Sequence, residues 1–400
     1  MQLDDCVKII KRAELESVIK RRQGEVKSAE CWRFLNAGLG LDDALAEAYR
    51  AGARFALLGI PESISVEANG GRPGATEAWE CCLASLANIQ DNRFFDGSQL
   101  VLVGNIACAQ CADLGASAPA EAESISSHAS APAEVESVSS NASAQSVSES
   151  TEPNASSSSV ATSVCTPLSL EVARALSAEN SERVAQVVRA IVAQGLMPLV
   201  VGGGHGNAYG LIKGAVEGDK QRCQGKMAVV NCDPHADFRA LEGHHSGNGF
   251  SYAFFEGFLK SYYAVALHES YNSEAMLQNM DAAGVAYSLY EDIFVRGELT
   301  WEQALQKAAE RLEICACPVG VELDLDSIAF MPSSAMLPYG ISVREAARYL
   351  HVMASRLQVS YLHLPEGAPS LAPDGERTVG RALAFLLTVF VKACQKRRRH

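Results

Sequence analysis

The sequence predicts an α/β fold with three layers, in which helices cover both faces of one eight-stranded, mostly parallel sheet. Two observations predict this class. Short apolar runs alternate with longer amphipathic segments along most of the chain, which is the pattern of strands that alternate with helices. Polar and glycine-rich motifs follow several of the apolar runs directly, and sites in open parallel sheets lie beyond the carboxyl ends of the strands.

Eight short apolar runs are the expected strands. They are residues 55–60, 100–103, 199–201, 228–231, 264–267, 285–288, 319–323 and 360–364. Amphipathic segments between them are expected to be helices, and the clearest are residues 76–86, 168–194, 301–312 and 343–357. Residues 1–53 precede the first run and are expected to form a helical N-terminal extension.

One segment differs from the rest in composition. Residues 115–163 are nearly all Ser, Ala, Glu, Val and Pro, and the hexapeptide ASAPAE at 116–121 returns at 129–134. Such a segment buries too little apolar surface to offset the entropy lost on ordering. We therefore expect a disordered insertion at 115–163 within a single domain made of residues 54–114 and 164–400.

The bulk composition argues against several classes of partner. The chain has 34 basic and 47 acidic residues, a net charge of −13, so broad electrostatic attraction to nucleic acid or to an anionic membrane is not expected. No stretch approaches the ~20 apolar residues of a membrane span, and the N-terminus lacks an apolar core of signal-peptide length. Twelve scattered cysteines form no disulfide framework. These features predict a cytoplasmic protein.

The first motif with chemical content follows the third expected strand, where GGGHG occupies residues 202–206. Three glycines permit a tight turn and a close backbone approach. The loop lacks the Lys-Ser/Thr pair of a P-loop, and its effect is to present His205 at a strand end. Taken alone, this histidine is more simply explained as structural.

Two acidic motifs follow later strands. DPHAD at residues 233–237 places Asp233, His235 and Asp237 on one face of an extended chain, and DLD at 324–326 does the same for Asp324 and Asp326. Converging carboxylates and an imidazole repel one another or lose hydration unless a cation lies among them. Each motif alone could be a polar turn, with an aspartate that caps a helix or faces solvent.

The three motifs together are far more specific than any one of them, because each ends a strand of the same predicted sheet. Four carboxylates and two imidazoles suit a divalent ion of intermediate hardness such as manganese, with zinc and iron as alternatives. Six ligands are too many for one tetrahedral ion and suit two ions that share carboxylates. The predicted ligands are His205, Asp233, His235, Asp237, Asp324 and Asp326.

At these residues the chain resembles the ureohydrolases, the family of arginase, agmatinase and formimidoylglutamase. GGH at 203–205, D-x-H-x-D at 233–237 and D-x-D at 324–326 match that family's metal motifs in order. The resemblance extends to GRPGA at 71–75, GISVRE at 340–345 and EGAP at 366–369, and it covers the chain from Arg54 onward apart from the insertion.

The resemblance implies a role for each ligand. His205 and Asp237 would bind one manganese ion and His235 and Asp326 the other, while Asp233 and Asp324 would bridge both. A metal-bridging hydroxide would attack the amidine or guanidine carbon, and Asp237 would pass on the proton. Glu345 would pair with the substrate's cationic nitrogens, which require a planar bidentate acceptor.

Smaller features bear on the substrate. Arg239, which could hold a substrate carboxylate, and His245-Ser246-Gly247 resemble the formimidoylglutamase branch, and His245 is a candidate proton shuttle. Asn248 begins a stretch, residues 248–252, that departs from that branch and lacks its arginine. It is a third substrate-binding candidate with Arg239 and Glu345.

The predicted function is therefore hydrolysis of a linear amidine, best matched by N-formimidoyl-L-glutamate, to L-glutamate and formamide. One alternative is hydrolysis of a guanidino compound with release of urea, and another is a metal-binding relative without catalysis. The resemblance also implies a homo-oligomer.

Overall fold

The computed structural model describes residues 2–109 and 168–397. The expected insertion at 115–163 lies outside these residues. The described residues other than Leu168 belong to one compact unit, Met1–Asp113 together with Ser169–His400.

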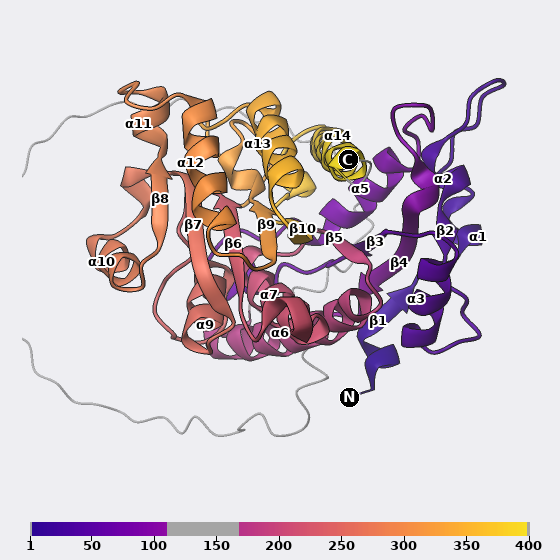
Figure 1. Cartoon of the computed structure of the whole chain (residues 1–400), viewed down its shortest axis with the longest axis horizontal. Helices are drawn as coiled ribbons and strands as arrows, with labels where there is room; N and C mark the ends of the chain where they lie inside the picture. The colour runs from indigo at the N-terminus through magenta and orange to yellow at the C-terminus, as the bar shows by residue number, and fades with distance from the viewer. Residues whose placement is uncertain (1, 110–167, 398–400) are drawn as a thin grey trace, which may run out of the picture. The chain divides into compact units, whose positions relative to one another are not determined.

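A single mixed sheet forms the middle layer of this unit (Figure 1). Within the described residues it has ten strands. Along the sheet they are β1 (Val7–Ile9), β4 (Leu100–Ile106), β3 (Phe55–Gly59), β5 (Met197–Val201), β10 (Val359–Leu364), β9 (Val319–Leu323), β6 (Met227–Cys232), β7 (Leu259–Leu267) and β8 (Ala286–Leu289), and β2 (Arg33–Phe34) also pairs with β4. All pairs are parallel except β1 with β4. All eight expected strands are present.

The sheet has ten strands instead of the eight expected, because residues 1–53 are not simply a helical extension. They contain the helices α1 (Arg12–Leu15), α2 (Ser28–Cys31) and α3 (Leu41–Arg50). They also add β1 and β2, both of which pair with β4. Strands of three and two residues are too short to show an alternating pattern in sequence.

Helices cover both faces of the sheet, as expected. One face carries α5 (Ala78–Leu86), α12 (Trp301–Glu313), α13 (Val343–Arg356) and α14 (Gly375–Arg397), and the other carries α3, α6 (Leu170–Ala193), α7 (Ala208–Gly218) and α9 (Gly249–Phe255). The remaining α-helices are α4 (Ile64–Glu67), α8 (Lys220–Cys223), α10 (Glu274–Ala282) and α11 (Tyr290–Phe294).

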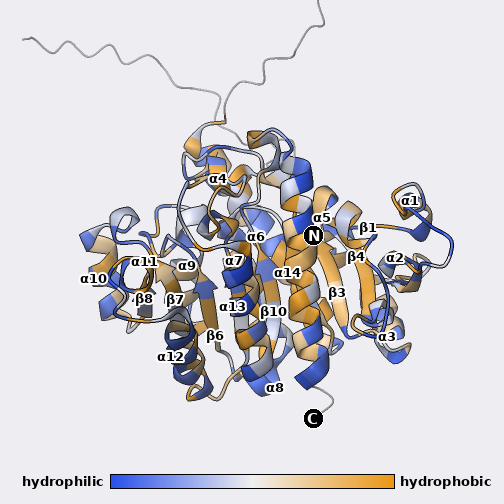
Figure 2. Ribbon diagram, turned by 90° about the horizontal axis from the view of Figure 1, so that it is seen from above, coloured by the Kyte–Doolittle hydropathy of each residue, from blue (hydrophilic) through white to orange (hydrophobic). Residues whose placement is uncertain are grey.

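Alternation along the strands divides the interior into two cores. In β6, Ala228, Val230 and Cys232 lie in the core under α12 and α13, whereas Met227 and Val229 lie in the core under α6 and α7. Successive side chains of a strand point to opposite faces, so strands buried on both sides are apolar throughout. Figure 2 shows this contrast, with β3 and β4 in apolar orange and α12 largely in blue.

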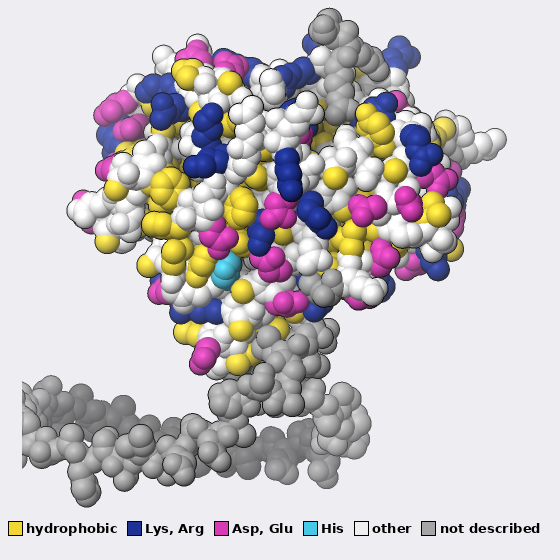
Figure 3. Space-filling view, turned by 60° about the horizontal axis from the view of Figure 1, so that its bottom comes forward, with side chains coloured by type: hydrophobic (Ala, Val, Ile, Leu, Met, Phe, Trp, Pro, Cys, Tyr) yellow, Lys and Arg dark blue, Asp and Glu magenta, His cyan; other side chains and the backbone are white. Residues whose placement is uncertain are grey.

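Helix α14 is long and apolar enough to cross a membrane by length and composition alone, contrary to the expectation from the sequence. However, 72% of its most apolar window is buried inside the fold, mainly against α5 and α13. A core helix has this pattern. On the face shown in Figure 3, Lys and Arg side chains are interspersed with Asp and Glu, so that face carries no extended basic area.

Candidate metal centre

Four neighbouring strands in the middle of the sheet end at the candidate site. The motifs at 202–206, 233–237 and 324–326 follow the carboxyl ends of β5, β6 and β9, and residues 366–369 follow β10. Because parallel strands end at the same edge, residues far apart in sequence meet there. The six predicted ligands do come together at this edge.

The His205 ring lies at the centre of the cluster and is 1% exposed. Its Nδ1 is 2.9 Å from Oδ2 of Asp237, 2.9 Å from Oδ2 of Asp324 and 3.0 Å from Oδ2 of Asp233. None of these contacts has hydrogen-bond geometry, so this buried nitrogen has no hydrogen-bond partner among the described residues. A nitrogen that faces three carboxylate oxygens without bonding to any of them is arranged to ligate a cation, and the donor set fits a divalent metal.

The carboxylate of Asp233 faces two histidines. Its Oδ2 faces His205, whereas its Oδ1 lies 3.4 Å from Nδ1 of His235. That nitrogen is also 3.9 Å from Oδ2 of Asp326. The two oxygens of Asp233 therefore face two adjacent sets of ligands, one oxygen to each set. This arrangement is expected of a carboxylate that bridges two ions.

The carboxyl groups perturb one another strongly. Burial raises the pKa of Asp324 well above its usual range, and the charges of Asp233 and Asp326 raise it further. Burial and the Asp233 charge also raise the pKa of Asp237. For His235, burial lowers the pKa, but the hydrogen bond and charge of Asp233 outweigh it and raise the pKa to about 10. Like charges packed this closely are stable together only with compensating positive charge.

Two residues of the site have backbone conformations that favour glycine. Asp237 has φ of 48° and Glu366 has φ of 66°, both in the left-handed region that costs non-glycine residues energy. Strained backbone of this kind is concentrated at functional sites. Gly203, with φ of 70°, gives the preceding turn the same freedom without that cost.

A cavity of about 290 Å³ opens above the cluster. Its floor contains the ligands His235, Asp237, Asp324 and Asp326. Around them it is lined by Val66, Asn69, Gly71, Arg239, Ser246, Gly247, Tyr271, Met276, Ser334, Ala335 and Glu366. The loop at 71–75, which is part of the family resemblance, contributes Gly71 to this lining.

Arg239 reaches this cavity from the loop after β6. One guanidinium nitrogen donates to Oδ1 of Asn69 at 2.6 Å, and another donates to Oε1 of Glu242 at 3.1 Å. The side chain is 49% exposed. Two hydrogen bonds orient the guanidinium while leaving part of it open to the cavity, as the predicted substrate-binding role would require.

Glu345 is not in the cavity, contrary to the expected role. It is the third residue of α13, where its carboxylate accepts hydrogen bonds from the amide and hydroxyl of Ser342. The hydroxyl of Ser342 in turn accepts from the Glu345 amide. This capping box holds Glu345 at the helix end.

His245 and Asn248 also lie outside the cavity lining, and both are completely buried. Nδ1 of His245 accepts from the Gly247 amide and Nε2 contacts Oε1 of Glu242. Asn248 donates to the carbonyls of Ala240 and Gly243 and accepts from the amide of His245. Their polar groups stabilise the loop that carries Arg239, so the structure does not support a proton-shuttle or substrate-binding role for either.

No role was predicted for Glu366, although the motif at 366–369 is part of the family resemblance. The structure places Glu366 in the cavity lining. Its Oε1 accepts from the amide of His205 at 2.8 Å, and its Oε2 is buried without a hydrogen-bond partner among the described residues. Burial and the Asp326 charge raise its pKa to about 8. A glutamate directly after a buried strand was the signal available in the sequence.

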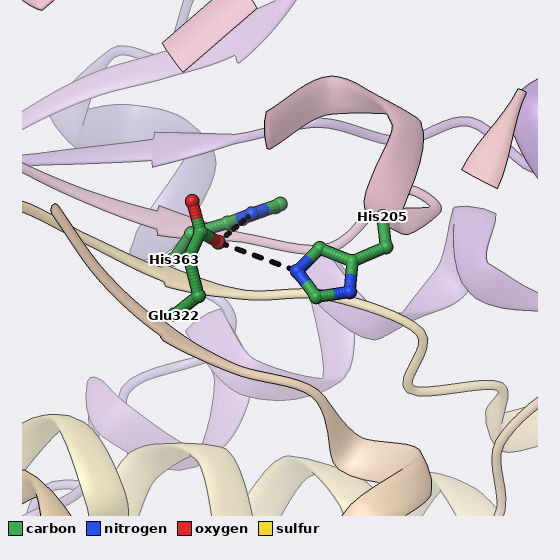
Figure 4. Close-up of side chains that lie close together, drawn as sticks. All are labelled: His205, Glu322 and His363. Carbon is green, nitrogen blue, oxygen red and sulfur yellow. Dashed lines mark hydrogen bonds and ion pairs between the residues drawn. The ribbon is translucent and has the colours of Figure 1, made fainter. Parts of the chain in front are cut away.

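A second buried cluster that the sequence analysis missed lies directly beneath His205 (Figure 4). It consists of Glu322 on β9 and His363 on β10, both 0% exposed. Burial would raise the pKa of Glu322, but the charge and the hydrogen bond of His363, together with the nearby ring of His205, lower it to about 2.

Comparison with known proteins agrees with this geometry. The sequence model described as the arginase family matches residues 53–391. The chain belongs to the arginase family. The fold expected from the resemblance is thereby confirmed.

Curated proteins and solved structures are also similar to this chain. A formimidoylglutamase from a Geobacillus species is 23% identical over 222 residues, and the match covers 55% of this chain and 67% of the relative. One from Macrococcus caseolyticus is 28% identical over 190 residues, which cover 47% of this chain and 58% of the relative. The match therefore spans only about three-fifths of the length of such relatives.

The solved structures match over more of the chain at lower identity. The formimidoylglutamase of Bacillus subtilis superposes with a TM-score of 0.66 at 15% identity and covers 94% of each chain. The Trypanosoma cruzi formiminoglutamase with Mn2+2 gives 0.59 at 16% identity, with 92% of this chain and 98% of that chain covered. At this identity the superpositions establish the fold.

Proposed function

We propose that this arginase-family protein is a dinuclear manganese hydrolase that cleaves a C–N bond of a linear amidine, with N-formimidoyl-L-glutamate as substrate and L-glutamate and formamide as products. The observation that carries this proposal is the convergence of three carboxylates on the unpartnered Nδ1 of His205. The names of the curated relatives favour the formimidoyl substrate over other amidines.

Each of the two sets of ligands surrounds the position of one metal ion. His205, Asp233, Asp237 and Asp324 surround one position, and His235 and Asp326 complete a second with Asp233. When bound, two such ions polarise the amidine and lower the pKa of water. Manganese suits this mixture of carboxylates and imidazoles, and zinc or iron are the alternatives.

The chain's own residues hold the substrate in place. Glu366 offers an unpartnered, buried carboxylate oxygen in the cavity, which is a suitable acceptor for the planar cation of an amidine. We therefore assign to Glu366 the role that the resemblance had given to Glu345. Arg239, on the same cavity, is placed to pair with a substrate carboxylate. Asp237 also lines the cavity and is the carboxylate we assign to proton transfer.

The decisive experiment is an assay of the manganese-loaded protein against a substrate panel that contains formimidoylglutamate, arginine, agmatine and guanidino acids. Formamide, urea and ammonia are measured separately. We expect formamide from formimidoylglutamate. Urea from a guanidino compound without formamide would establish the ureohydrolase alternative, and tight manganese binding without turnover of any compound would establish the non-catalytic one.

Arg239→Met tests whether this arginine binds the substrate carboxylate. The variant keeps an apolar stem but loses the charge. We expect KM for formimidoylglutamate to rise at least tenfold and kcat to change much less. The reason is that the lost interaction stabilises the ground state and the transition state equally. Arg50→Met is the matched control, since Arg50 is exposed at the end of α3 and does not line the cavity, and it should leave KM unchanged. An unchanged KM in Arg239→Met would refute the assignment.

We also propose that the protein is cytoplasmic, as the composition of the chain predicts, and that it is a homo-oligomer, as the family resemblance implies. Light scattering coupled to size-exclusion chromatography measures the molar mass against the 42.6 kDa of one chain. A mass of 42.6 kDa would contradict the oligomer.

A further inference from the structure

The ring of His205 has a second nitrogen whose environment is unexplained by metal binding. Nδ1 faces the carboxylates, so a metal there requires the lone pair of Nδ1 and leaves the proton on Nε2. That Nε2 is buried and has no hydrogen-bond partner among the described residues. A buried N–H group almost always has an acceptor, and the Oε2 of Glu322 lies 3.6 Å away (Figure 4).

Glu322 is held firmly in this position. Its Oε1 accepts from the hydroxyl of Tyr361 at 2.7 Å, and its Oε2 is 2.6 Å from Nδ1 of His363. The other ring nitrogen of His363 lies 3.3 Å from the carbonyl of Gly202. His363 therefore connects Glu322 to the same loop that carries His205.

The register of the sheet explains this arrangement. Glu322 pairs with His363 on β10 and with Asn231 on β6, so the three form one polar row across the sheet. Glu322 precedes Asp324 by two residues, and Asn231 precedes Asp233 by two. Asn231 donates to Oδ2 of Asp233 at 3.0 Å. The row therefore lies directly beneath the ligands and contacts two of them.

We propose that Glu322, held by Tyr361 and His363, is a positioning residue that accepts the Nε2 proton of His205 and so fixes the tautomer in which Nδ1 binds metal. A fully buried carboxylate is otherwise expensive, and nothing in the cavity requires one at this depth. Partners of this kind behind metal-binding histidines commonly change metal affinity by about 10–100-fold. The inference rests on the metal centre of the proposed function.

The test is Glu322→Gln in the full chain, with manganese binding measured by titration calorimetry and electron paramagnetic resonance. We expect a roughly 10–100-fold loss of affinity for one of the two ions. At two equivalents of manganese, wild-type protein should show an exchange-coupled pair of ions, whereas the variant should show the spectrum of a single bound ion. Tyr361→Phe, which removes one donor to Glu322, should change the affinity in the same direction by a smaller factor.

Ser288→Ala is the matched control, because it removes a buried hydrogen bond to the Tyr263 hydroxyl in the same sheet without touching the site. Its manganese affinity should equal that of the wild type.

Wild-type affinity for both ions in folded Glu322→Gln would overturn the proposal. Equal weakening of both ions together with a lower Tm of the metal-free protein would also overturn it, because that result indicates a purely structural role. If Glu322→Gln does not fold, unchanged binding in Tyr361→Phe overturns the proposal instead. Wild-type protein that binds no manganese would refute the metal centre itself.

Discussion

At the scale of single residues, Asp233 has the most demanding position. It is fully buried, it faces both candidate metal positions, and its two oxygens also accept hydrogen bonds from Asn231 and from the amide of His235. An amide in place of this carboxylate would point its N–H groups at other N–H donors or at a cation. Neither contact is favourable.

Asp233→Asn should therefore lose manganese and at least ~100-fold of the amidine-hydrolysing activity, since disruption of a metal shell typically costs this much. Metal content and kcat/KM are the measurements. Asp42→Asn makes the same chemical change at an exposed position on α3 and should alter neither. Near-native activity in Asp233→Asn would contradict the dinuclear assignment.

The metal ligands could be predicted from sequence because spacing by two residues at strand ends determines which side chains share a face. The roles of Glu345, His245 and Asn248 could not, because their side chains are used locally. Ser342 and Glu345 form a capping pair whose S-x-x-E spacing was visible in the sequence. The loop bonds of His245 and Asn248, and the pairing of Glu322 with His363, depend on contacts that spacing alone does not determine.

At the scale of secondary structure, α6 and α7 pack closely because α7 presents glycines to α6. A Cβ on Gly210 would lie 2.4 Å from the Ser181 carbonyl oxygen, and one on Gly214 would lie 2.5 Å from that of Ala185. Helix α7 follows the loop of His205 directly. The small residues of α7 therefore help to position a metal ligand.

Gly214→Ala should destabilise the protein even though alanine is the better helix former by about 1 kcal/mol. The new methyl group meets backbone that cannot rotate away, and overpacking of this kind costs about 1–3 kcal/mol. The midpoint of urea unfolding should fall. Gly38→Ala, where the nearest atom is an ordinary 3.4 Å away, should leave it unchanged. A higher midpoint for Gly214→Ala would show that the two helices separate easily.

Strands β1 and β2 could not be predicted from the sequence. Of the eight expected strands, those inside the sheet were recognisable because burial on both faces makes them mainly apolar, with Asn231, Glu322 and His363 as buried polar exceptions. The eighth, β8, lies at the edge of the sheet and is only partly buried. Edge strands of two or three residues owe their conformation to backbone hydrogen bonds with β4, and backbone bonding leaves little trace in side-chain type.

At the scale of the whole molecule, the described segments that flank the insertion lie close to each other along α6. The amide of Ala109 donates to Oδ1 of Asn180 in α6 at 2.6 Å, and α6 begins ten residues earlier at Leu170. At 1.5 Å per residue, these two points of the chain are roughly 15 Å apart along the helix.

Deletion of residues 115–163 should therefore leave the domain folded and active. Residues 110–114 and 164–169 remain, and a linker of this length can reach roughly 35 Å when extended. Loop entropy also changes slowly with length. Thermal unfolding and manganese-dependent turnover should match those of the full chain. Aggregation or loss of turnover would show that the segment has a role in this fold.

The left-handed backbone of Asp237 and Glu366 has a consequence for the stability of the fold. Glycine would adopt these φ values of 48° and 66° without steric cost, whereas each acidic residue holds strain in the folded state. Replacement of either residue by glycine would relieve that strain and at the same time remove a carboxylate from the cavity. At these two positions the stability of the fold and the chemistry of the cavity oppose each other.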